Sequence, residues 1–506
     1  MSQRNIVSGR KLLSNTAFYA FADLIGKGLH FILLPLYTAF LTTTDYGIQN
    51  MVTSFNSVLN YVVLLCLDSA ALKYYSEYSD DERKLKRFYG TAIVIVCSFA
   101  LLVVTICLVS HTILEKYVFE GVDFVPYVLL GLSVLVLDSI YTLHRRMLEA
   151  QQKGKKVATV GVVAVIFSTG TTLVMIGIFK LGALGVILAT LITSIGTVIF
   201  AIVDIFRNEM ITICFDSELA KKMLSYSLPL IPHQLSGPLA ALIGRIFLNT
   251  TGSLAVVGLY GVATQFSSVV DVFQDATSRA FRPWLFGILN NKGGGEYREK
   301  INNISCILIS LYSVVAVGMG LFSQEIITVM TDKDYYGAWL VIPVLVFSVS
   351  VRTIYYFYFA QCLFYQGTSK YIFIASITAN LCNIIASAAL VPLIGMYGSA
   401  IAAMCSIVVN TTVIYIINRK NGEIGFRLLK LLFRLIVSWI VIVIGVAPSY
   451  LVFSEGTTLF NVAYKIFSIL IYLVLIWVIN KRCIYSFTET ANVKELFSKI
   501  VGWKRV

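Results

Sequence analysis

Charged residues are scarce in this chain. Of its 506 residues only 13% are Asp, Glu, Lys or Arg, whereas 58% are hydrophobic, and the mean hydropathy is +0.81. Soluble globular domains carry about 25% charged residues, so this composition excludes a soluble protein of several domains. The sequence instead predicts an all-α polytopic membrane protein.

Metal-binding, disulfide and catalytic patterns are also missing. The chain has only 4 His and 9 Cys, and the cysteines occur singly, mostly inside apolar segments. Because no CxxC pair or Cys/His cluster occurs, we interpret the cysteines as small core residues and expect no metal site. The loops are short and lack HExxH, P-loop and GxSxG motifs, so we expect neither an enzyme nor a bound cofactor.

Long apolar runs dominate what is present. We count 14 segments of about 20 mostly apolar residues, the length that crosses a membrane as a helix. An even number places both termini on one side of the membrane. If that side is the cytoplasm, the outer loops hold only Lys116, Lys180 and Lys333. This asymmetry predicts cytoplasmic termini and accounts for the net charge of +13 without a nucleic acid partner.

The inner loops are correspondingly basic. The densest one, from Arg145 to Lys156, would attract anionic headgroups of membrane lipids. The orientation rule alone also explains its charge.

The chain repeats its own pattern near its midpoint. Residues 224–266 reproduce the order found in residues 13–55, which is an apolar segment, a short polar turn and a second apolar segment. Matching positions include Gly47 with Gly258, Thr53 with Thr264, and Phe55 with Phe266. Later segments match as well, so six crossings are repeated in the same orientation, as in transporters with a central path.

The repeat predicts four regions. We expect an N-terminal six-helix lobe in 1–205, a cytoplasmic linker in 206–224 that lies along the membrane, a C-terminal six-helix lobe in 225–418, and two further helices with a cytoplasmic tail in 419–506. The expected fold is therefore about 14 transmembrane helices, arranged as two pseudo-symmetric lobes plus two C-terminal helices.

Ionisable side chains inside the apolar segments need a partner, water or a function, because each costs about 2.5–3.5 kcal/mol there. In the segment 14–40, Asp23, Lys27 and His30 share one helical face. We expect this face to line an aqueous cavity. Alternatively, Asp23 and Lys27 neutralise each other at i and i+4, which leaves His30 unexplained.

Two segments of the second repeat carry further charges. Arg245 follows three prolines in the segment 225–248, and it either serves a ligand or extends to the membrane surface. Asp271, Asp275 and Arg279 lie at i, i+4 and i+8 in the next segment. We favour a local pair between Asp275 and Arg279, which leaves Asp271 for function.

The repeat relates two more pairs of charges. Arg352 occupies the position that Asp138 has in the first repeat, and Arg279 the position of Asp68. Opposite charges at equivalent positions form a hypothetical gate that bridges the halves in one conformation and separates in another. The alternative is that each charge is paired locally or lies at the membrane surface.

Loose motifs in both repeats resemble a known family. They are Asn15, Pro35 to Tyr37 and Asp45 to Gly47 in the first repeat, and Ser227 to Pro232, Arg245 and Gly258 to Gly261 in the second. This pattern resembles the polysaccharide-transporter branch of the multidrug/oligosaccharidyl-lipid/polysaccharide exporter superfamily. Members of that branch are flippases for the repeat units of O antigen, capsule and exopolysaccharide.

The resemblance implies a function and a site. It implies that undecaprenyl-pyrophosphate-linked oligosaccharide crosses a bacterial inner membrane by alternating access, with a polysaccharide polymerase and glycosyltransferases as candidate partners. The expected substrate-binding residues are Lys27, His30, Arg245 and Arg352. The expected residues for ion or proton coupling or gating are Asp23, Asp68, Asp138, Asp271, Asp275 and Arg279. The two C-terminal helices would hold the lipid tail, as in the lipid II flippases.

Other functions stay open at this point. A multidrug or cation antiporter of the same superfamily would typically have twelve helices and an acidic, aromatic pocket, and a lipid II-type flippase would share the extra helix pair. A membrane glycosyltransferase or polymerase should expose large outward loops, whereas the loops of this chain are short.

Overall fold

The computed structural model describes residues 26, 28–29, 31–78, 81–290, 296–365, 371–420, 424–453 and 458–490. Within these residues every regular element is helical, which confirms the predicted all-α class. Eleven described helices are long and apolar enough to cross a membrane, or up to 12 if one bent pair counts as a single span. Asp23, Lys27 and His30 lie outside the described residues.

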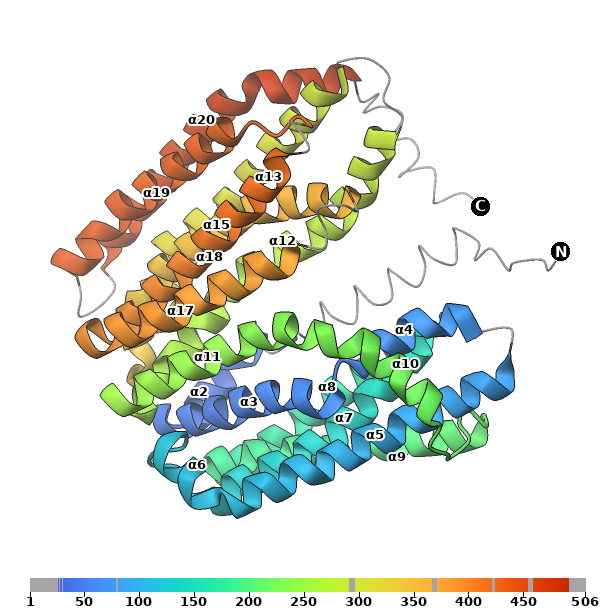
Figure 1. The fold of residues 1–506 in the computed structure, drawn as a ribbon. Coiled ribbons are helices and arrows are strands. Elements are labelled where there is room, and N and C mark those ends of the chain that lie inside the picture. The colour runs from blue at the N-terminus through green and yellow to red at the C-terminus, as the bar shows by residue number, and fades with distance from the viewer. Residues whose placement is uncertain are drawn as a thin grey trace, which may run out of the picture. The chain divides into compact units, whose positions relative to one another are not determined.

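The contacts divide the chain into two compact units (Figure 1). Unit 1 comprises Met1–Gly261 with Ser387–Met396, and unit 2 comprises Val262–Ala386 with Tyr397–Val506. Two helices, α12 (Leu254–Asn290) and α17 (Ile372–Ile394), contribute residues to both units. The lobe boundaries expected from the repeat stay a prediction.

Unit 1 is a bundle in which α3, α7 and α9 pack against one another. Its helices are α2 (Leu34–Phe40), α3 (Thr43–Leu64), α4 (Leu67–Tyr78), α5 (Glu82–Val109), α6 (His111–Tyr117), α7 (Leu129–Ala150), α8 (Gly154–Leu173), α9 (Gly182–Arg207), α10 (Ser217–Ser227) and α11 (Ile231–Thr251). Three short helical segments connect them, namely η1 (Phe124–Val128), η2 (Val174–Ile178) and η3 (Leu228–Leu230).

Asp45 fixes the beginning of two helices. Its carboxylate accepts hydrogen bonds from the backbone N–H and the hydroxyl of Thr42, at 3.1 and 2.7 Å, which caps α3. It also accepts from the N–H of Ala183 at 2.9 Å, at the first turn of α9. Free N–H groups and the helix dipole both favour a carboxylate at a helix N-terminus. One side chain therefore ties α3 to α9.

Two glycines allow the equivalent helices of the repeats to touch. A Cβ at Gly47 of α3 would lie 1.9 Å from the carbonyl oxygen of Leu254, and a Cβ at Gly258 of α12 would lie 2.0 Å from that of Thr43. The contact is reciprocal, because Thr43 and Leu254 are also equivalent in the repeat. Only a residue without a side chain permits this approach.

The backbone between α3 and α4 bends through 47°. Leu65 and Cys66 both adopt left-handed conformations there, with φ of 48° and 54°, and both are buried. Non-glycine residues rarely adopt such angles, and they keep them only when the surrounding packing holds them in place. The apolar run between Thr43 and Tyr78 therefore forms two helices that meet at a bend.

The linker between the repeats is anchored to α5 and α4. The N–H of Thr212 donates to the carbonyl of Lys86 at 3.1 Å, and α10 begins only at Ser217. Lys222 of α10 forms an ion pair with Glu77 of α4. The hydrogen bond to Glu77 raises the pKa of Lys222 above its ordinary value.

Unit 2 contains the rest of α12 and a layer made by the last two helices. Its other elements are α13 (Glu296–Leu321), α14 (Ser323–Met330), η4 (Lys333–Val341), α15 (Ile342–Phe364), part of α17, α18 (Met396–Arg419), α19 (Leu428–Leu451) and α20 (Leu459–Thr490). Helix α13 packs against α15, α19 and α20. A Cβ at Gly445 of α19 would lie 2.2 Å from Leu321, so this packing is close.

Buried polar bonds hold α20 in unit 2. The ammonium of Lys465, whose side chain is fully buried, lies 2.7 Å from both carboxylate oxygens of Glu325 in α14. Asn480 receives a hydrogen bond from Arg434 of α19 at 3.0 Å and donates one to Ser310 of α13 at 2.8 Å. Because lipid offers no hydrogen bonds, such groups must be satisfied inside the protein.

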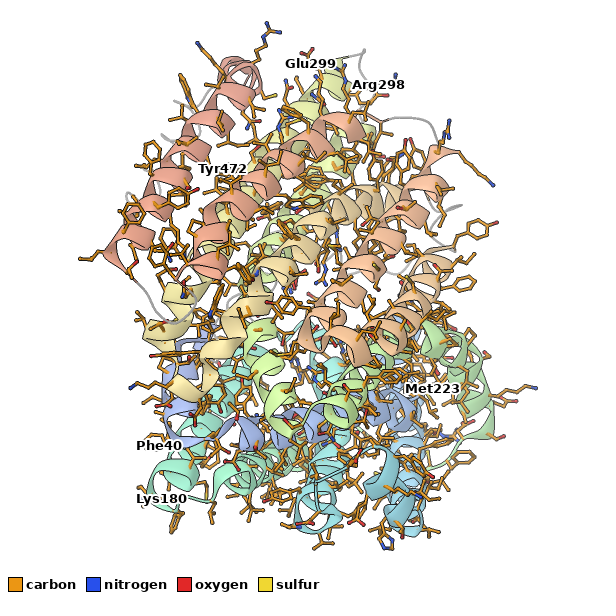
Figure 2. All side chains as sticks on the ribbon, turned by 90° about the vertical axis from the view of Figure 1, so that its left-hand side faces the viewer. Phe40, Lys180, Met223, Arg298, Glu299 and Tyr472 are labelled. Carbon is orange, nitrogen blue, oxygen red and sulfur yellow. The ribbon has the colours of Figure 1, made fainter. Side chains whose placement is uncertain are left out.

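Apolar side chains both fill the units and cover their surfaces. Met223 in unit 1 and Tyr472 in unit 2 are completely buried (Figure 2). Many other large apolar side chains are exposed, including Leu101 of α5, Phe206 of α9 and Trp477 of α20. Exposed apolar surface on this scale is expected of helices that face lipid rather than water.

Candidate functional site

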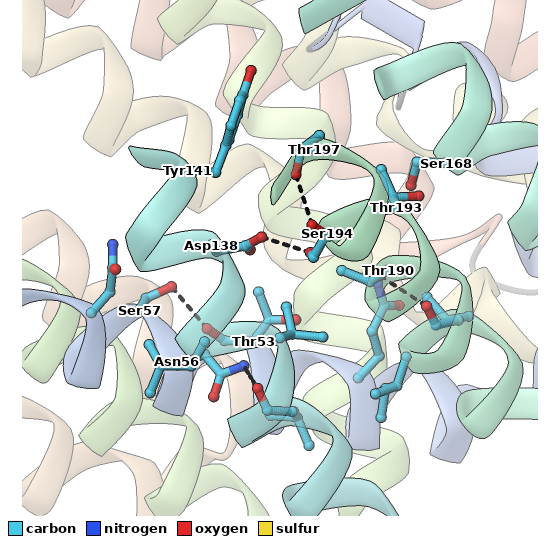
Figure 3. A pocket seen from close by; sticks show the side chains of 18 of the residues that line it. Thr53, Asn56, Ser57, Asp138, Tyr141, Ser168, Thr190, Thr193, Ser194 and Thr197 are labelled. Carbon is cyan, nitrogen blue, oxygen red and sulfur yellow. Dashed lines mark hydrogen bonds between the residues drawn. The ribbon is translucent and has the colours of Figure 1, made fainter. Parts of the chain in front are cut away.

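A polar cavity of about 440 Å³ lies inside unit 1, between α3, α7, α8 and α9 (Figure 3). Most of its polar lining consists of hydroxyl and amide side chains. They are Gln49, Thr53, Asn56, Ser57, Asn60, Thr142, Ser168, Thr190, Thr193, Ser194 and Thr197, with Tyr141 and Asp138 beside them. The cavity is open, because Thr53 and Ser57 are exposed.

The repeated spacing of hydroxyls on α9 produces one wall of this cavity. Thr190, Thr193, Ser194 and Thr197 follow the i, i+3, i+4, i+7 pattern, so they share one helical face. Each of these side chains is small enough to leave space beside the helix. Their polar oxygens are therefore presented to the cavity as a row.

Close contacts between α3 and α7 form the opposite wall. A Cβ at Gly131 of α7 would lie 2.4 Å from Val52, and the amide of Asn56 donates to the carbonyl of Gly131 at 2.8 Å. One turn further along, the hydroxyl of Ser139 donates to the side-chain oxygen of Asn60 at 3.1 Å. These bonds fix the two asparagines at the cavity.

Asp138 is the charged member of the cavity lining. The hydroxyl of Ser194 donates to its Oδ1 at 2.6 Å, which is a short, charge-assisted bond between α7 and α9. No Lys, Arg or His occurs among the lining residues of the described cavity. The cavity is therefore neutral to negative, and it is rich in oxygen atoms.

A second polar cluster joins α12 to α15 in unit 2. Arg352 donates to Asp271 at 2.7 Å, and Tyr356 donates to Asp275. Gln274 donates to the carbonyl of Val349 at 3.0 Å and to the hydroxyl of Thr353 at 2.8 Å. This cluster contains three charged residues of the second repeat, namely Arg352, Asp271 and Asp275.

The two clusters occupy equivalent places in the repeat. Asn60 of α3 corresponds to Asp271 of α12, and Asp138 of α7 corresponds to Arg352 of α15. The same helix interface therefore has a neutral amide next to a carboxylate in unit 1 and a guanidinium–carboxylate pair in unit 2. The equivalent interfaces of the two units therefore consist of corresponding helices but carry different charges.

Arg245 lies on α11 beside two tyrosines, Tyr46 and Tyr260. Its guanidinium has one long contact, from Nη1 to the carbonyl oxygen of Ala241 at 3.5 Å. Its Nε is buried and has no hydrogen-bond partner in the described part of the chain. Among the described residues no carboxylate is bonded to this guanidinium, and a guanidinium with unused donors is available to an anion.

The remaining predicted residues are separate from the cavity. Asp68 of α4 lies 3.5 Å from Arg146, which also binds Glu149 at 2.8 Å. Arg279 is an exposed residue of α12. Of the residues predicted as functional, the structure brings together Arg352 and Asp271, and it places Asp138 alone in a cavity. The bridge expected between Asp138 and Arg352 stays a prediction.

Uncharged residues of the site were not predicted from the sequence. Asn56, Asn60 and the hydroxyl side chains of α9 are uncharged, whereas the prediction from the sequence was based on ionisable residues. The signal was the four hydroxyls at helical spacing between Thr190 and Thr197 in an otherwise apolar helix. Tyr356 and Gln274 carried no such signal.

Together, the helices and the cavity define a class of protein: a polytopic helical membrane protein with a polar cavity inside one helix bundle. A family model described as polysaccharide biosynthesis protein matches residues 12–288, more than half of the chain. The chain belongs to this family, within the polysaccharide-transporter branch of the multidrug/oligosaccharidyl-lipid/polysaccharide exporter superfamily, which confirms the predicted family.

Individual proteins are similar over most of the chain. Lsg locus putative protein 1 of Haemophilus influenzae is 20% identical over 400 residues, which are 77% of this chain and 95% of that protein. Lipid II flippase MurJ in an inward closed conformation has a similar fold, with 14% identity and a TM-score of 0.67 over 92% of this chain and 99% of that one. A multidrug resistance MATE family transporter in an inward-facing conformation has a TM-score of 0.61 at 14% identity, over 80% and 98% of the two chains.

Proposed function

We propose that this protein is a flippase that moves undecaprenyl-pyrophosphate-linked oligosaccharide repeat units from the inner to the outer leaflet by alternating access. Its family supports a place in polysaccharide biosynthesis, and its fold resembles that of a lipid II flippase. The observation that carries the proposal is Arg245, a guanidinium inside an apolar helix whose Nε lacks a hydrogen-bond partner among the described residues. A pyrophosphate offers the acceptor oxygens that this guanidinium needs.

In this proposal Arg352 is the second anchor for the pyrophosphate. It keeps one bond to Asp271, and its side chain is 36% exposed, so further N–H groups can reach a ligand. Lys27 and His30 complete the proposed substrate-binding set. Both belong to the predicted first segment, 14–40, and lie outside the described residues.

Carboxylates are the proposed carriers of the coupling ion or proton. We include Asp23, Asp68, Asp138, Asp271 and Asp275, with Arg279 as a gating partner. Asp138 is favoured, because it lines an open cavity and only one of its oxygens has a bonded hydroxyl. The driving force would otherwise come from consumption of the product in the outer leaflet.

The proposed arrangement in the membrane follows the sequence pattern. It has 14 helices as two six-helix lobes plus the pair α19–α20, which holds the lipid tail, and both termini lie in the cytoplasm of a bacterial cell. The substrate class is the repeat unit of an O antigen, a capsule or an exopolysaccharide. Glycosyltransferases supply the substrate and a polymerase consumes it.

The test is translocation of a fluorescent lipid-linked oligosaccharide by the purified protein in vesicles. Arg245→Gln should slow translocation about tenfold or more, because a charge-assisted hydrogen bond contributes roughly 1.5–3 kcal/mol. Arg207→Gln is the matched control, since Arg207 is an exposed residue at the end of α9. Equal rates for both variants would refute the role of Arg245, and no translocation by the wild type would refute the function.

Two other functions share the fold. The similarity to a MATE transporter, together with Asp138 in its cavity, supports a cation antiporter, and the similarity to MurJ supports a lipid II flippase. The same vesicles distinguish them. An antiporter moves small organic cations against a proton or sodium gradient and leaves the lipid in place, and a lipid II flippase prefers lipid II to the other oligosaccharide lipids.

A further inference from the structure

Five hydroxyl groups of the unit 1 cavity, four of them on α9, already donate their protons within the protein. Ser57 donates to the carbonyl of Thr53 at 2.8 Å, Thr190 to that of Val186 at 2.9 Å, and Thr193 to that of Ala189 at 2.9 Å. Thr197 donates to the carbonyl of Ser194 at 3.0 Å, while Ser194 donates to Asp138. A hydroxyl whose proton is engaged in this way offers only lone pairs to a ligand. The α9 wall of the cavity therefore offers acceptors rather than donors of hydrogen bonds to a ligand.

An acceptor-rich wall selects against anions. A pyrophosphate oxygen needs N–H or O–H donors or a cation, and at the α9 wall it would meet oxygen lone pairs and the carboxylate of Asp138. A ligand with many hydroxyl groups fits better, because each hydroxyl can donate to one of these oxygens. The amide of Asn60 adds a donor, since its oxygen already accepts from Ser139.

The size and the apolar lining of the cavity also fit a saccharide. A volume of about 440 Å³ is far more than a single dehydrated cation occupies. It falls within the usual range of about 300–1,000 Å³ for small-molecule sites. Val52, Leu135 and Ile187 supply apolar surface for the C–H faces of a sugar ring.

We propose that this cavity binds the uncharged sugars of the lipid-linked substrate, while the pyrophosphate is held elsewhere, at the guanidinium groups. The inference rests on the proposed function and adds a preference for neutral over acidic sugars. Sugars whose hydroxyl groups are free bind in the cavity, whereas uronic acids are excluded by Asp138. The equivalent interface of unit 2 carries Arg352 and Asp271 instead, so it offers charged groups where the unit 1 cavity offers mostly neutral ones.

Binding of two lipids to the purified protein in nanodiscs tests this inference. One lipid is undecaprenyl pyrophosphate with a neutral disaccharide, and the other is undecaprenyl pyrophosphate without sugar. The variant is Thr190→Val with Thr193→Val, which removes two acceptors with little change in volume. Thr105→Val is the matched control, because Thr105 makes the same type of backbone bond at 2.8 Å on an exposed face of α5.

The double variant should weaken binding of the disaccharide lipid about five- to fiftyfold, as expected for two neutral hydrogen bonds. Binding of the sugar-free lipid should stay unchanged, and the control should bind both lipids as the wild type does. An equal effect on both lipids, or no effect, overturns the sugar site and leaves the flippase. A wild type that binds neither lipid overturns the proposed function and this inference with it.

One measurement on the wild-type protein needs no variant. A lipid carrying a disaccharide with a uronic acid should bind at least tenfold more weakly than its neutral counterpart, and equal binding overturns the inference. Titration with sodium in the absence of lipid tests the competing occupant. A sodium site abolished by Thr190→Val with Thr193→Val, combined with unchanged sugar binding, would show that the cavity serves an ion instead.

Discussion

A carboxylate has two oxygens that accept hydrogen bonds. Whether an aspartate can also bind a ligand depends on which of these oxygens already have partners within the protein. Ser194 occupies one oxygen of Asp138, while the other faces a cavity lined by neutral groups. Asp271 instead meets a guanidinium at 2.7 Å. The first carboxylate therefore has an oxygen that can reach a ligand, whereas the second already bonds to the guanidinium of Arg352.

Asp138→Asn should lower the translocation rate about ten- to a hundredfold, because an amide nitrogen replaces one acceptor and a charge-assisted bond is lost, worth roughly 1.5–3 kcal/mol. The measurement is the initial rate in vesicles. Asp123→Asn serves as the control, since Asp123 is exposed in the segment before η1. A rate within twofold of the wild type would exclude Asp138 from both sugar binding and coupling.

Exchanging the charges of the unit 2 pair should largely preserve folding. Arg352→Asp or Asp271→Arg alone places like charges together, and each should lower the free energy of unfolding by about 1–3 kcal/mol, given that the side chains are 36% and 22% exposed. The double exchange should recover at least half of that loss in a thermal melt. Additive losses would mean that the two residues do not interact.

Elements of the fold meet through small residues and buried polar bonds. The helices α3 and α12 touch through glycines, whereas α20 is attached to α14 through the ion pair of Lys465 and Glu325. In lipid there is little hydrophobic gain from bringing helices together, so close backbone approach and polar bonds provide the association.

Gly47→Ala and Gly258→Ala should each destabilise the protein by about 1–3 kcal/mol, because the new methyl group would overlap a carbonyl oxygen and force the helices apart. Thermal melts of the purified variants measure this loss. Gly161→Ala in α8 is the control, since a Cβ there has nothing within 4 Å, and it should leave stability unchanged or slightly higher. Equal melting temperatures for all three would disprove the contact.

Lys465→Met should cost about 3–5 kcal/mol, because it leaves the carboxylate of Glu325 buried without its cation. Adding Glu325→Met should restore most of the stability, since a pair of apolar residues carries no unpaired charge. Unfolding in increasing denaturant compares the three proteins. A double variant as unstable as the single one would show that the pair is needed for more than charge balance.

At the scale of the whole molecule, the all-α class and the membrane character could be predicted from the sequence, whereas the two-lobe repeat stays a prediction. Composition and the length of apolar segments depend on many residues. They therefore predict the fold class even where the interpretation of a single residue is wrong. The bend at Leu65 and Cys66 was not readable, because both are ordinary apolar residues in an unbroken run. The partner of Arg352 was also missed, since Asp271 is 81 positions away and sequence spacing predicts only pairs within one helix.

The predicted orientation in the membrane is testable in intact cells. Lys116→Cys should react with a membrane-impermeant maleimide added outside, and Lys155→Cys should react only after the membrane is opened, because the first lies in a predicted outer loop and the second in a predicted inner loop. Both positions are exposed in the structure. The reverse pattern would place both termini outside the cell.

The engaged hydroxyl protons of Thr190, Thr193 and Thr197 have a consequence for the order of biosynthetic steps. A cavity that recognises donors loses affinity for any sugar whose hydroxyl groups have been acetylated or methylated, since the modified oxygen has no proton to give. Enzymes that decorate the sugars in this way would therefore act after the repeat unit has crossed the membrane.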